Sequence, residues 1–159
     1  MNKPNKKEAR NAVVIRNKKA RFEYEFVDTY VAGLVLKGTE IKSIRAGKAS
    51  INEAYCFVQN NEVFVKNMHI AHYEWASFVQ HEAKALRKLL LNKKEIRKML
   101  SAVQGAGITA VPLKLFINER GLAKLEIAVV RGKKLHDKRQ TIKERDTKIM
   151  LDRIKKKHV

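Results

Sequence analysis

The chain has little cysteine and no long apolar run. Cys56 is the only cysteine among 159 residues, which excludes an internal disulfide and suits a reducing compartment. No segment approaches the run of about 18 apolar residues that a transmembrane helix needs, so no membrane partner is expected. The first eleven residues, MNKPNKKEARN, lack the apolar stretch of a signal peptide. These absences together predict a cytoplasmic location.

Catalytic and metal-binding patterns are also lacking. His69, His72 and His81 lie close in sequence, but no carboxylate or cysteine completes a metal-ligand spacing. Cys56 stands among strand-forming residues, which indicates a small buried hydrophobe. Residues 105–107, GAG, follow a predicted helix and indicate a C-cap turn instead of a phosphate loop. No serine-centred nucleophile motif is present, so we expect no enzyme, no cofactor and no metal.

Acidic residues are scarce beside basic ones. There are 16 Asp or Glu against 35 Lys or Arg, and the formal net charge is +19. Residues 1–21 and residues 132–159 each carry a net charge of +7, whereas the 110 residues between them carry +5. This distribution predicts a globular middle with basic extensions that bind a polyanion such as RNA. Two solubilising tails are the alternative interpretation.

Local patterns in the first half predict strands and one short helix. Residues 24–36 are rich in β-formers. Thr39 is a predicted N-cap for a helix over residues 39–46, and Gly47 ends it. Two β-rich runs flank Asn60-Asn61, which indicates a hairpin. Residues 73–85 lack a clear period and predict a loop.

The second half predicts one helix and another hairpin. Asn92 and Glu95 have the spacing of a capping box, so a helix should begin near Lys93. The apolar runs ITAVPLKLFI and LAKLEIAVV, separated by NERG, predict the hairpin, and Pro112 predicts an edge or a bulge within it. The sum is a mainly β fold with short helices, an antiparallel barrel that resembles the oligonucleotide-binding fold. We assign residues 12–131 to this domain, residues 1–11 to a flexible basic arm and residues 132–159 to a basic tail.

The tail has helical signals but no apolar face. Thr141 and Glu144 have capping-box spacing, and no Gly or Pro follows Gly132. Two i,i+4 acid–base pairs lie in the favourable order. The apolar residues do not form one stripe, so the tail cannot dock firmly on its own domain. We expect a segment that is disordered alone and helical against a polyanion.

Candidate RNA-binding side chains fall into two chemical groups. Cations that flank the predicted barrel elements suit phosphate contacts, and aromatic residues suit stacking on unpaired bases, although core packing is the commoner use of each aromatic. The cations are Lys18, Lys19, Arg21, Lys42, Arg45, Lys48, Arg87, Lys88, Lys93 and Lys94, and the aromatic residues are Phe22, Tyr24, Tyr55, Tyr73 and Trp75.

Four stretches together resemble the SsrA-binding protein family, also called small protein B, the protein partner of tmRNA. They are NKKARFEY (17–24), AGLVLKGTEIKSIRAGKASI (32–51), RKLLLNKKEI (87–96) and GKKLHDKRQTIKERD (132–146). The resemblance implies a bacterial RNA-binding protein, monomeric when free, that grips the tRNA-like domain of tmRNA. It also implies delivery of tmRNA to stalled 70S ribosomes for trans-translation. A ribosomal protein or an RNA-processing factor with the same barrel is the alternative.

The resemblance also implies individual roles. Leu90, Asn92 and Lys124 match positions that grip the tRNA-like domain, and Asn17 opens the first matching stretch. The tail is implied to probe the decoding centre and the empty mRNA channel. Val31 stands where the family usually has glutamate, which puts that RNA contact in doubt. The implied tail residues are Gly132, Lys133, Lys134, Leu135, His136, Asp137, Lys138 and Arg139, with Lys143 and Arg145 beyond them.

Overall fold

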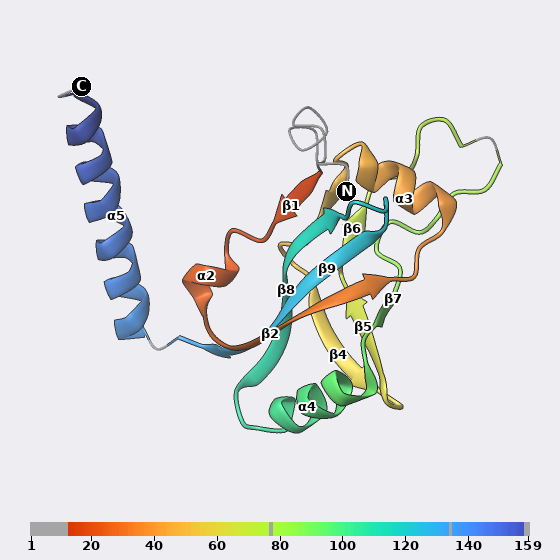
Figure 1. Ribbon diagram of the computed structural model, residues 1–159, viewed down its shortest axis with the longest axis horizontal. Coiled ribbons are helices and arrows are strands. Elements are labelled where there is room, and N and C mark those ends of the chain that lie inside the picture. The colour runs from red at the N-terminus through yellow and green to blue at the C-terminus, as the bar shows by residue number, and fades with distance from the viewer. Residues whose placement is uncertain (1–12, 77, 134, 158–159) are drawn as a thin grey trace, which may run out of the picture.

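A computed structural model describes residues 13–76, 78–133 and 135–157 (Figure 1). The basic arm predicted over residues 1–11 lies outside these ranges. The elements are β1 (Val14–Arg16), α2 (Ala20–Glu23), β2 (Tyr24–Leu34), α3 (Gly38–Arg45), β3 (Ala49–Ser50), β4 (Tyr55–Gln59), β5 (Glu62–Lys66), β6 (His69–Ile70), β7 (Arg87–Leu90), α4 (Lys93–Val103), β8 (Ile108–Ile117), β9 (Ala123–Gly132) and α5 (Leu135–Lys157).

Six strands form a closed ring. They pair in the order β8-β4-β5-β7-β2-β9, and β9 returns to β8 as the second half of a long hairpin. Each of these pairings is antiparallel. The step from β4 to β8 is the single pair Cys56 and Ala110, so the ring is not a strict barrel. The predicted mainly β, antiparallel class with short helices is confirmed, and α3 and α4 lie at opposite ends of the ring (Figure 1).

The core fills the inside of the ring, and a smaller apolar cluster lies outside it. On β9, Ile127 and Val129 face the inner core, whereas Ala128 and Val130 face the outer cluster with Ala20 of α2. Successive side chains of a strand point to opposite faces, so this stretch of β9 is buried on both. The largest fully buried side chains include Ile44, Ile51, Met68, Leu89, Met99, Leu115 and Leu125.

The predicted turns are confirmed by backbone geometry. Asn60 and Asn61 have φ values of 51° and 59° between β4 and β5, as a two-residue hairpin turn requires. The register of β8 against β9 shifts between Pro112 and Lys114, so the proline lies at a bulge.

The start of α3 differs from the prediction. The helix begins at Gly38, and the Glu40 carboxylate accepts a hydrogen bond of 2.7 Å from the backbone N–H of Lys37. Thr39 is therefore inside the helix and not its N-cap. Its hydroxyl lies 2.8 Å from Nδ1 of His81 instead, a contact between segments that local sequence does not reveal.

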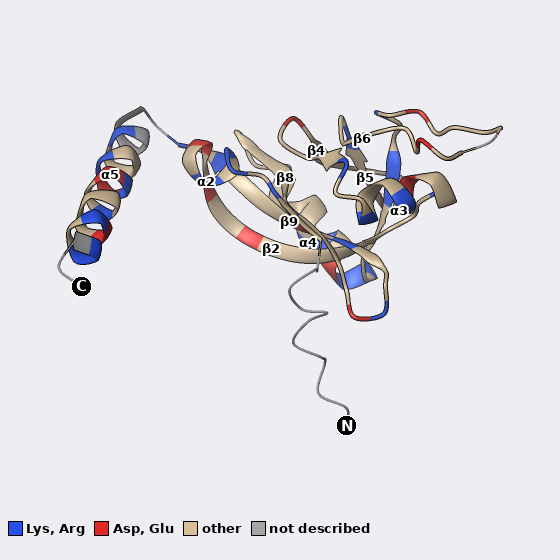
Figure 2. Cartoon of the chain, turned by 90° about the horizontal axis from the view of Figure 1, so that it is seen from above, with Lys and Arg blue, Asp and Glu red and all other residues tan. Residues whose placement is uncertain are grey.

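The tail is a helix of 23 residues that stands away from the ring (Figure 2). Its helical character is confirmed, and the expected disorder of the tail in the absence of a polyanion stays a prediction. The absence of Gly and Pro and the length of the segment favour a helix. None of the helices in the described ranges combines the length and apolar character that a membrane crossing requires.

Candidate nucleic-acid interface

Three neighbouring strands bring Leu90, Gly33 and Lys124 together on the outside of the ring. Gly33 of β2 is in register with Leu90 of β7 on one side and with Lys124 of β9 on the other. A Cβ at Gly33 would lie 3.4 Å from the Leu90 Cβ and 3.7 Å from the Lys124 Nζ. Leu90 is 53% exposed although its neighbour Leu89 is buried. An apolar side chain and an ammonium group therefore meet over bare backbone, an arrangement that suits a nucleotide and its phosphate.

Asn92 lies beside this group, two residues beyond Leu90. Its backbone N–H donates a 3.0 Å hydrogen bond to the Glu95 carboxylate, which fixes the first turn of α4. Asn92 and Lys93 are both exposed there. We name Gly33, Leu90, Asn92 and Lys124 the Gly33 cluster.

Val31 borders the Gly33 cluster on β2. It is exposed and in register with Glu126 of β9. Because it lies two residues before Gly33, it shares the outer face of the strand. The position therefore presents an apolar side chain to solvent beside the cluster.

Cations from the domain and the tail meet between α2 and α5. Two hollows of about 380 and 440 Å³ share Lys18, Arg21 and Arg145 as lining residues. Among the described residues that line them, Glu126 is the single acidic one, and its carboxylate lies 3.5 Å from the Lys114 Nζ. The excess of cations gives this surface a positive charge, which suits a phosphate. We name it the α2–α5 groove.

Lys133 joins the tail to the domain. Its backbone N–H donates to the Glu23 carbonyl at 3.0 Å. Its Nζ donates to the Arg21 carbonyl at 2.9 Å and to the Thr141 Oγ1 at 3.0 Å. Gly132 before it still pairs with Tyr24 at the end of β9. Gly132, the first residue of the predicted tail, is therefore the last residue of β9.

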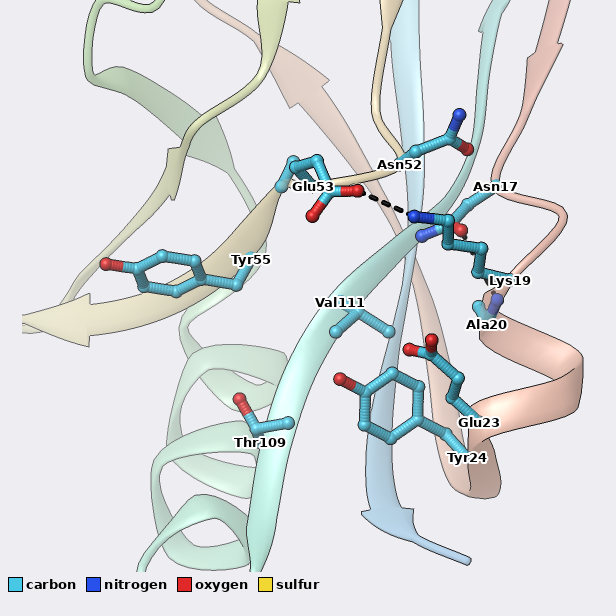
Figure 3. A pocket seen from close by; sticks show the side chains of 11 residues that line it. Asn17, Lys19, Ala20, Glu23, Tyr24, Asn52, Glu53, Tyr55, Thr109 and Val111 are labelled. Atoms are coloured by element: carbon cyan, nitrogen blue, oxygen red, sulfur yellow. Dashed lines mark hydrogen bonds and ion pairs between the residues drawn. The ribbon is translucent and has the colours of Figure 1, made fainter. Parts of the chain in front are cut away.

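A third hollow, of about 200 Å³, is polar (Figure 3). Lys19 crosses it to reach Glu53 at 2.8 Å. This hydrogen bond raises the pKa of Lys19 and lowers the pKa of Glu53. Tyr24 and Tyr55 line the same hollow, with Tyr24 half-buried. The predicted cation Lys19 is therefore already neutralised by an exposed partner.

The predicted cations near α3 have contacts of their own. The Lys42 Nζ lies 5.3 Å from the centre of the Tyr73 ring, and the Arg45 guanidinium donates to the Gly121 carbonyl at 3.2 Å. Lys48 pairs with Glu74 at 2.6 Å, and this contact lowers the pKa of Glu74. On β7, Lys88 pairs with Glu62 at 2.8 Å. All four pairs reach solvent, so these cations remain available to a competing phosphate.

The prediction that Arg87 contacts RNA is wrong. Arg87 is 3% exposed, and its Nε donates to the buried Glu40 carboxylate at 2.8 Å. Its Nη1 donates to the Met68 carbonyl at 2.6 Å. The remaining guanidinium bonds reach the carbonyls of Glu82, Ala83 and Ala85. A buried guanidinium with this many hydrogen-bond acceptors stabilises the fold, and we call it a structural centre.

Asn17 also has an internal role. Its side chain donates to the Pro112 carbonyl at 3.0 Å and accepts from the Ala20 N–H at 3.3 Å. The residue is 8% exposed. Asn17 therefore holds the start of α2 against the bulge of β8, and its contact with RNA stays a prediction.

Part of the predicted tail site lies outside the described residues. This holds for Lys134 and for the side chains of Leu135, His136, Asp137 and Lys138, whose backbone belongs to α5. Arg139, Lys143 and Arg145 are described and exposed.

Metal and thiol chemistry find no support in the described part of the chain. It contains no group of three or more His, Cys, Asp or Glu placed to hold a metal ion. The rings of His72 and His81 lie 5.7 Å apart, edge to face, but both nitrogens of His81 already face Thr39 and the Ile70 carbonyl. Cys56 is buried, which raises the pKa of its thiol. It is the small buried residue that the sequence predicted.

Sequence reasoning missed Glu40 and His81. Both are buried polar residues in the described structure. Glu40 pairs with Arg87 of β7, and His81 ties the loop before β7 to Thr39 and to the Ile70 carbonyl. The one local signal was Glu40, three residues after Lys37, which has capping-box spacing.

Comparison with known proteins agrees with this geometry. The family described as SmpB protein matches residues 14–157. The SsrA-binding protein of Christiangramia forsetii is 52% identical over 149 residues, which cover 94% of this chain and 95% of the relative. That of Phocaeicola vulgatus is 56% identical over 143 residues, which cover 90% and 95%.

Solved structures point the same way. A chain from a structure described as "tmRNA-SmpB: a journey to the center of the bacterial ribosome" has a TM-score of 0.67 and 44% identity. The match covers 78% of this chain and 87% of that one. A family match across nearly the whole length, with relatives above half identity, leaves one assignment: this chain belongs to the SmpB family of SsrA-binding proteins.

Proposed function

We propose that this chain binds tmRNA and delivers it to stalled ribosomes, where the incomplete polypeptide is tagged and released by trans-translation. The observation that carries the proposal is the family match over residues 14–157. The curated relatives are SsrA-binding proteins, and the structural neighbour comes from a tmRNA–SmpB–ribosome study. The partners are therefore tmRNA and the 70S ribosome.

We infer that the Gly33 cluster grips the tRNA-like domain of tmRNA. Leu90 offers an apolar contact surface and Lys124 a cation over the glycine between them. Asn92 and Lys93 add exposed polar groups at the adjacent helix start. Phosphate contacts fix the orientation of a bound RNA, whereas apolar and hydrogen-bonding contacts to unpaired nucleotides select it.

We infer that the tail contacts the decoding centre and the empty mRNA channel of the ribosome. An α-helix with exposed cations suits a channel lined by ribosomal RNA phosphates, and a channel that still holds message would exclude it. The residues assigned to the decoding centre are Gly132 to Arg139, with Lys143 and Arg145 further along the helix. Lys133 would hold the helix at a defined start through its bonds to Arg21 and Thr141.

The protein itself is not expected to catalyse a step. The SmpB family is an RNA-binding family, and the chemistry of rescue belongs to the RNA and the ribosome. A cytoplasmic location follows from those partners.

The test is a truncation after Arg131. The shortened chain should keep most of its affinity for the tRNA-like domain in a filter-binding measurement, because the Gly33 cluster is intact. Tagging in a reconstituted translation assay with stalled ribosomes should collapse. Loss of specific RNA binding on truncation would contradict this division between domain and tail.

A further inference from the structure

The loop between β6 and β7 exposes large apolar side chains. Trp75 is 81% exposed and Phe78 is 98% exposed, with Val79 exposed beside them. Aromatic residues of this size usually bury most of their surface. Trp75 contributes nothing to either apolar cluster of the fold. The exposure of Trp75 therefore indicates contact with a binding partner.

The loop is braced from within. The Gln80 side chain donates to the Tyr73 carbonyl at 2.6 Å and accepts from the Tyr73 N–H at 3.2 Å, which ties the two sides of the loop together. The Ala76 N–H donates to the Tyr73 carbonyl at 3.1 Å, which forms a turn around Trp75. The aromatic side chains are thus carried by a loop with defined internal bonds.

The buried polar centre of the domain anchors the same loop. His81 Nε2 lies 3.0 Å from the Ile70 carbonyl, and its Nδ1 lies 2.8 Å from the Thr39 hydroxyl. The Arg87 guanidinium donates to three carbonyls just before β7, those of Glu82, Ala83 and Ala85. Holding a contact group in place before binding lowers the entropy lost on binding.

Cations and an unsatisfied hydroxyl lie beside Trp75. A hollow of about 70 Å³ is lined by Trp75, Tyr73, Lys48 and Ser43, and also by Glu74, whose carboxylate pairs with the Lys48 Nζ at 2.6 Å in an exposed contact. The Ser43 Oγ is buried and has no hydrogen-bond partner among the described residues. The Lys42 Nζ lies over the Tyr73 ring, and among the described ion pairs none includes Lys42. A ligand that combines an aromatic ring, hydrogen-bonding groups and negative charge matches these features.

We propose that Trp75, together with Phe78, stacks on an unpaired nucleobase of tmRNA, with Lys42 at the adjoining phosphate. The inference rests on the proposed function and adds a contact site separate from the Gly33 cluster. The loop lies at the end of the molecule away from α5 in both views (Figures 1 and 2). When the tail enters the ribosome, this loop therefore stays at the other end of the molecule, where it can contact the RNA that the domain carries.

The sole tryptophan of the chain makes the contact directly observable. Unlabelled tRNA-like domain RNA is titrated into the full-length protein while tryptophan fluorescence is recorded, with a free-tryptophan control for absorption by the RNA. Stacking should quench the emission with the same midpoint as filter binding. Binding by filter assay without a change in fluorescence overturns the stacking site and leaves the proposed function standing. No binding in either assay overturns both.

Variants separate stacking from a general apolar contact. Trp75→Ala should weaken binding at least about fivefold, the lower end for loss of one base–aromatic stack. Trp75→Phe should keep most of the affinity, whereas Trp75→Leu, which is apolar without a ring face, should lose as much as Trp75→Ala. Because the side chain is exposed, all three variants should keep the wild-type thermal midpoint. Unchanged affinity in Trp75→Ala, or full affinity in Trp75→Leu, overturns the proposal and points to a protein partner for the loop.

Discussion

Arg87 and Leu90 lie three residues apart on β7, and they face opposite sides of it. Burial alternates along the strand, so Arg87 and Leu89 point inward while Lys88 and Leu90 point outward. The same stretch of sequence, RKLL, therefore supplies both a buried ion-pair residue, Arg87, and an exposed apolar residue, Leu90. Residue type alone would reverse these roles, because arginine is usually exposed and leucine usually buried.

Arg87→Ala should destabilise the domain severely. The substitution leaves the Glu40 carboxylate buried without its partner, which costs about 3–5 kcal/mol in comparable pairs. Urea unfolding followed by circular dichroism measures the loss. Lys88→Ala is the matched control, since its partner Glu62 is half exposed and the pair contributes about 1 kcal/mol or less. Equal stability of Arg87→Ala and wild type would show that the buried pair is not a structural centre.

Gly33→Val should weaken binding to the tRNA-like domain with little loss of stability. A Cβ at this position already makes van der Waals contact with Leu90 and Lys124, so the added methyl groups must move both side chains. We expect roughly a tenfold loss of affinity, equivalent to ~1.4 kcal/mol. Gly33→Ala is the control and should bind nearly as wild type does. Filter binding beside thermal unfolding distinguishes the two effects, and undiminished affinity in Gly33→Val would remove the cluster from the RNA contact.

At the scale of elements, α5 differs from the other helices. α4 packs Met99 into the core of the ring, whereas the apolar residues of α5, such as Ile149 and Leu151, are exposed. The tail helix touches the domain mainly near α2, through Lys133 and the α2–α5 groove. Its stability is therefore local.

Amides of α5 should exchange with solvent far faster than those of β9. A helix without tertiary packing opens with a free energy near zero, whereas central strands open only with global unfolding. We expect protection in α5 within roughly tenfold of an unstructured chain, and rising protection when stalled ribosomes are added. Hydrogen exchange read by mass spectrometry measures both. Protection in free α5 equal to that in β9 would show that the helix packs on the domain.

At the scale of the whole molecule, positive charge is the main feature that suits RNA binding. Of the net charge of +19, residues 1–21 and residues 132–159 each carry +7, so most of the charge lies toward the two ends of the chain. Exposed cations also line the ring and the α2–α5 groove. Several of them already have acidic partners, as Lys19, Lys48 and Lys88 do. Such exposed pairs are weak, so an RNA phosphate can replace the carboxylate.

RNA affinity should fall steeply with salt. If about six phosphates are neutralised, the logarithm of the association constant should decrease with the logarithm of salt concentration at a slope of roughly −4 to −5. Filter binding over a series of salt concentrations measures the slope. The truncation after Arg131 should keep most of the slope for the isolated RNA. A slope near zero would contradict an electrostatic basis for binding.

Much of the fold follows from short-range patterns in the sequence. The turn at Asn60-Asn61, the start of α4 at Lys93 and the bulge at Pro112 each depend on a few adjacent residues, and each matched its prediction. The sequence changes from β-patterned to charged at Gly132, which is the last residue of β9. These features are local because backbone conformation and capping are decided within one or two turns of chain.

Only the tertiary structure decided which residues from distant parts of the sequence lie in contact. Gly33, Leu90 and Lys124 come from three strands, and only their register places them side by side. The same holds for Arg87, whose partner Glu40 is 47 residues away. Sequence by itself determined the class of partner, because net charge and composition do not depend on folding. The burial of Asn17 and Arg87 and the exposure of Trp75 were decided by strand parity and long-range contacts, which no local pattern encodes.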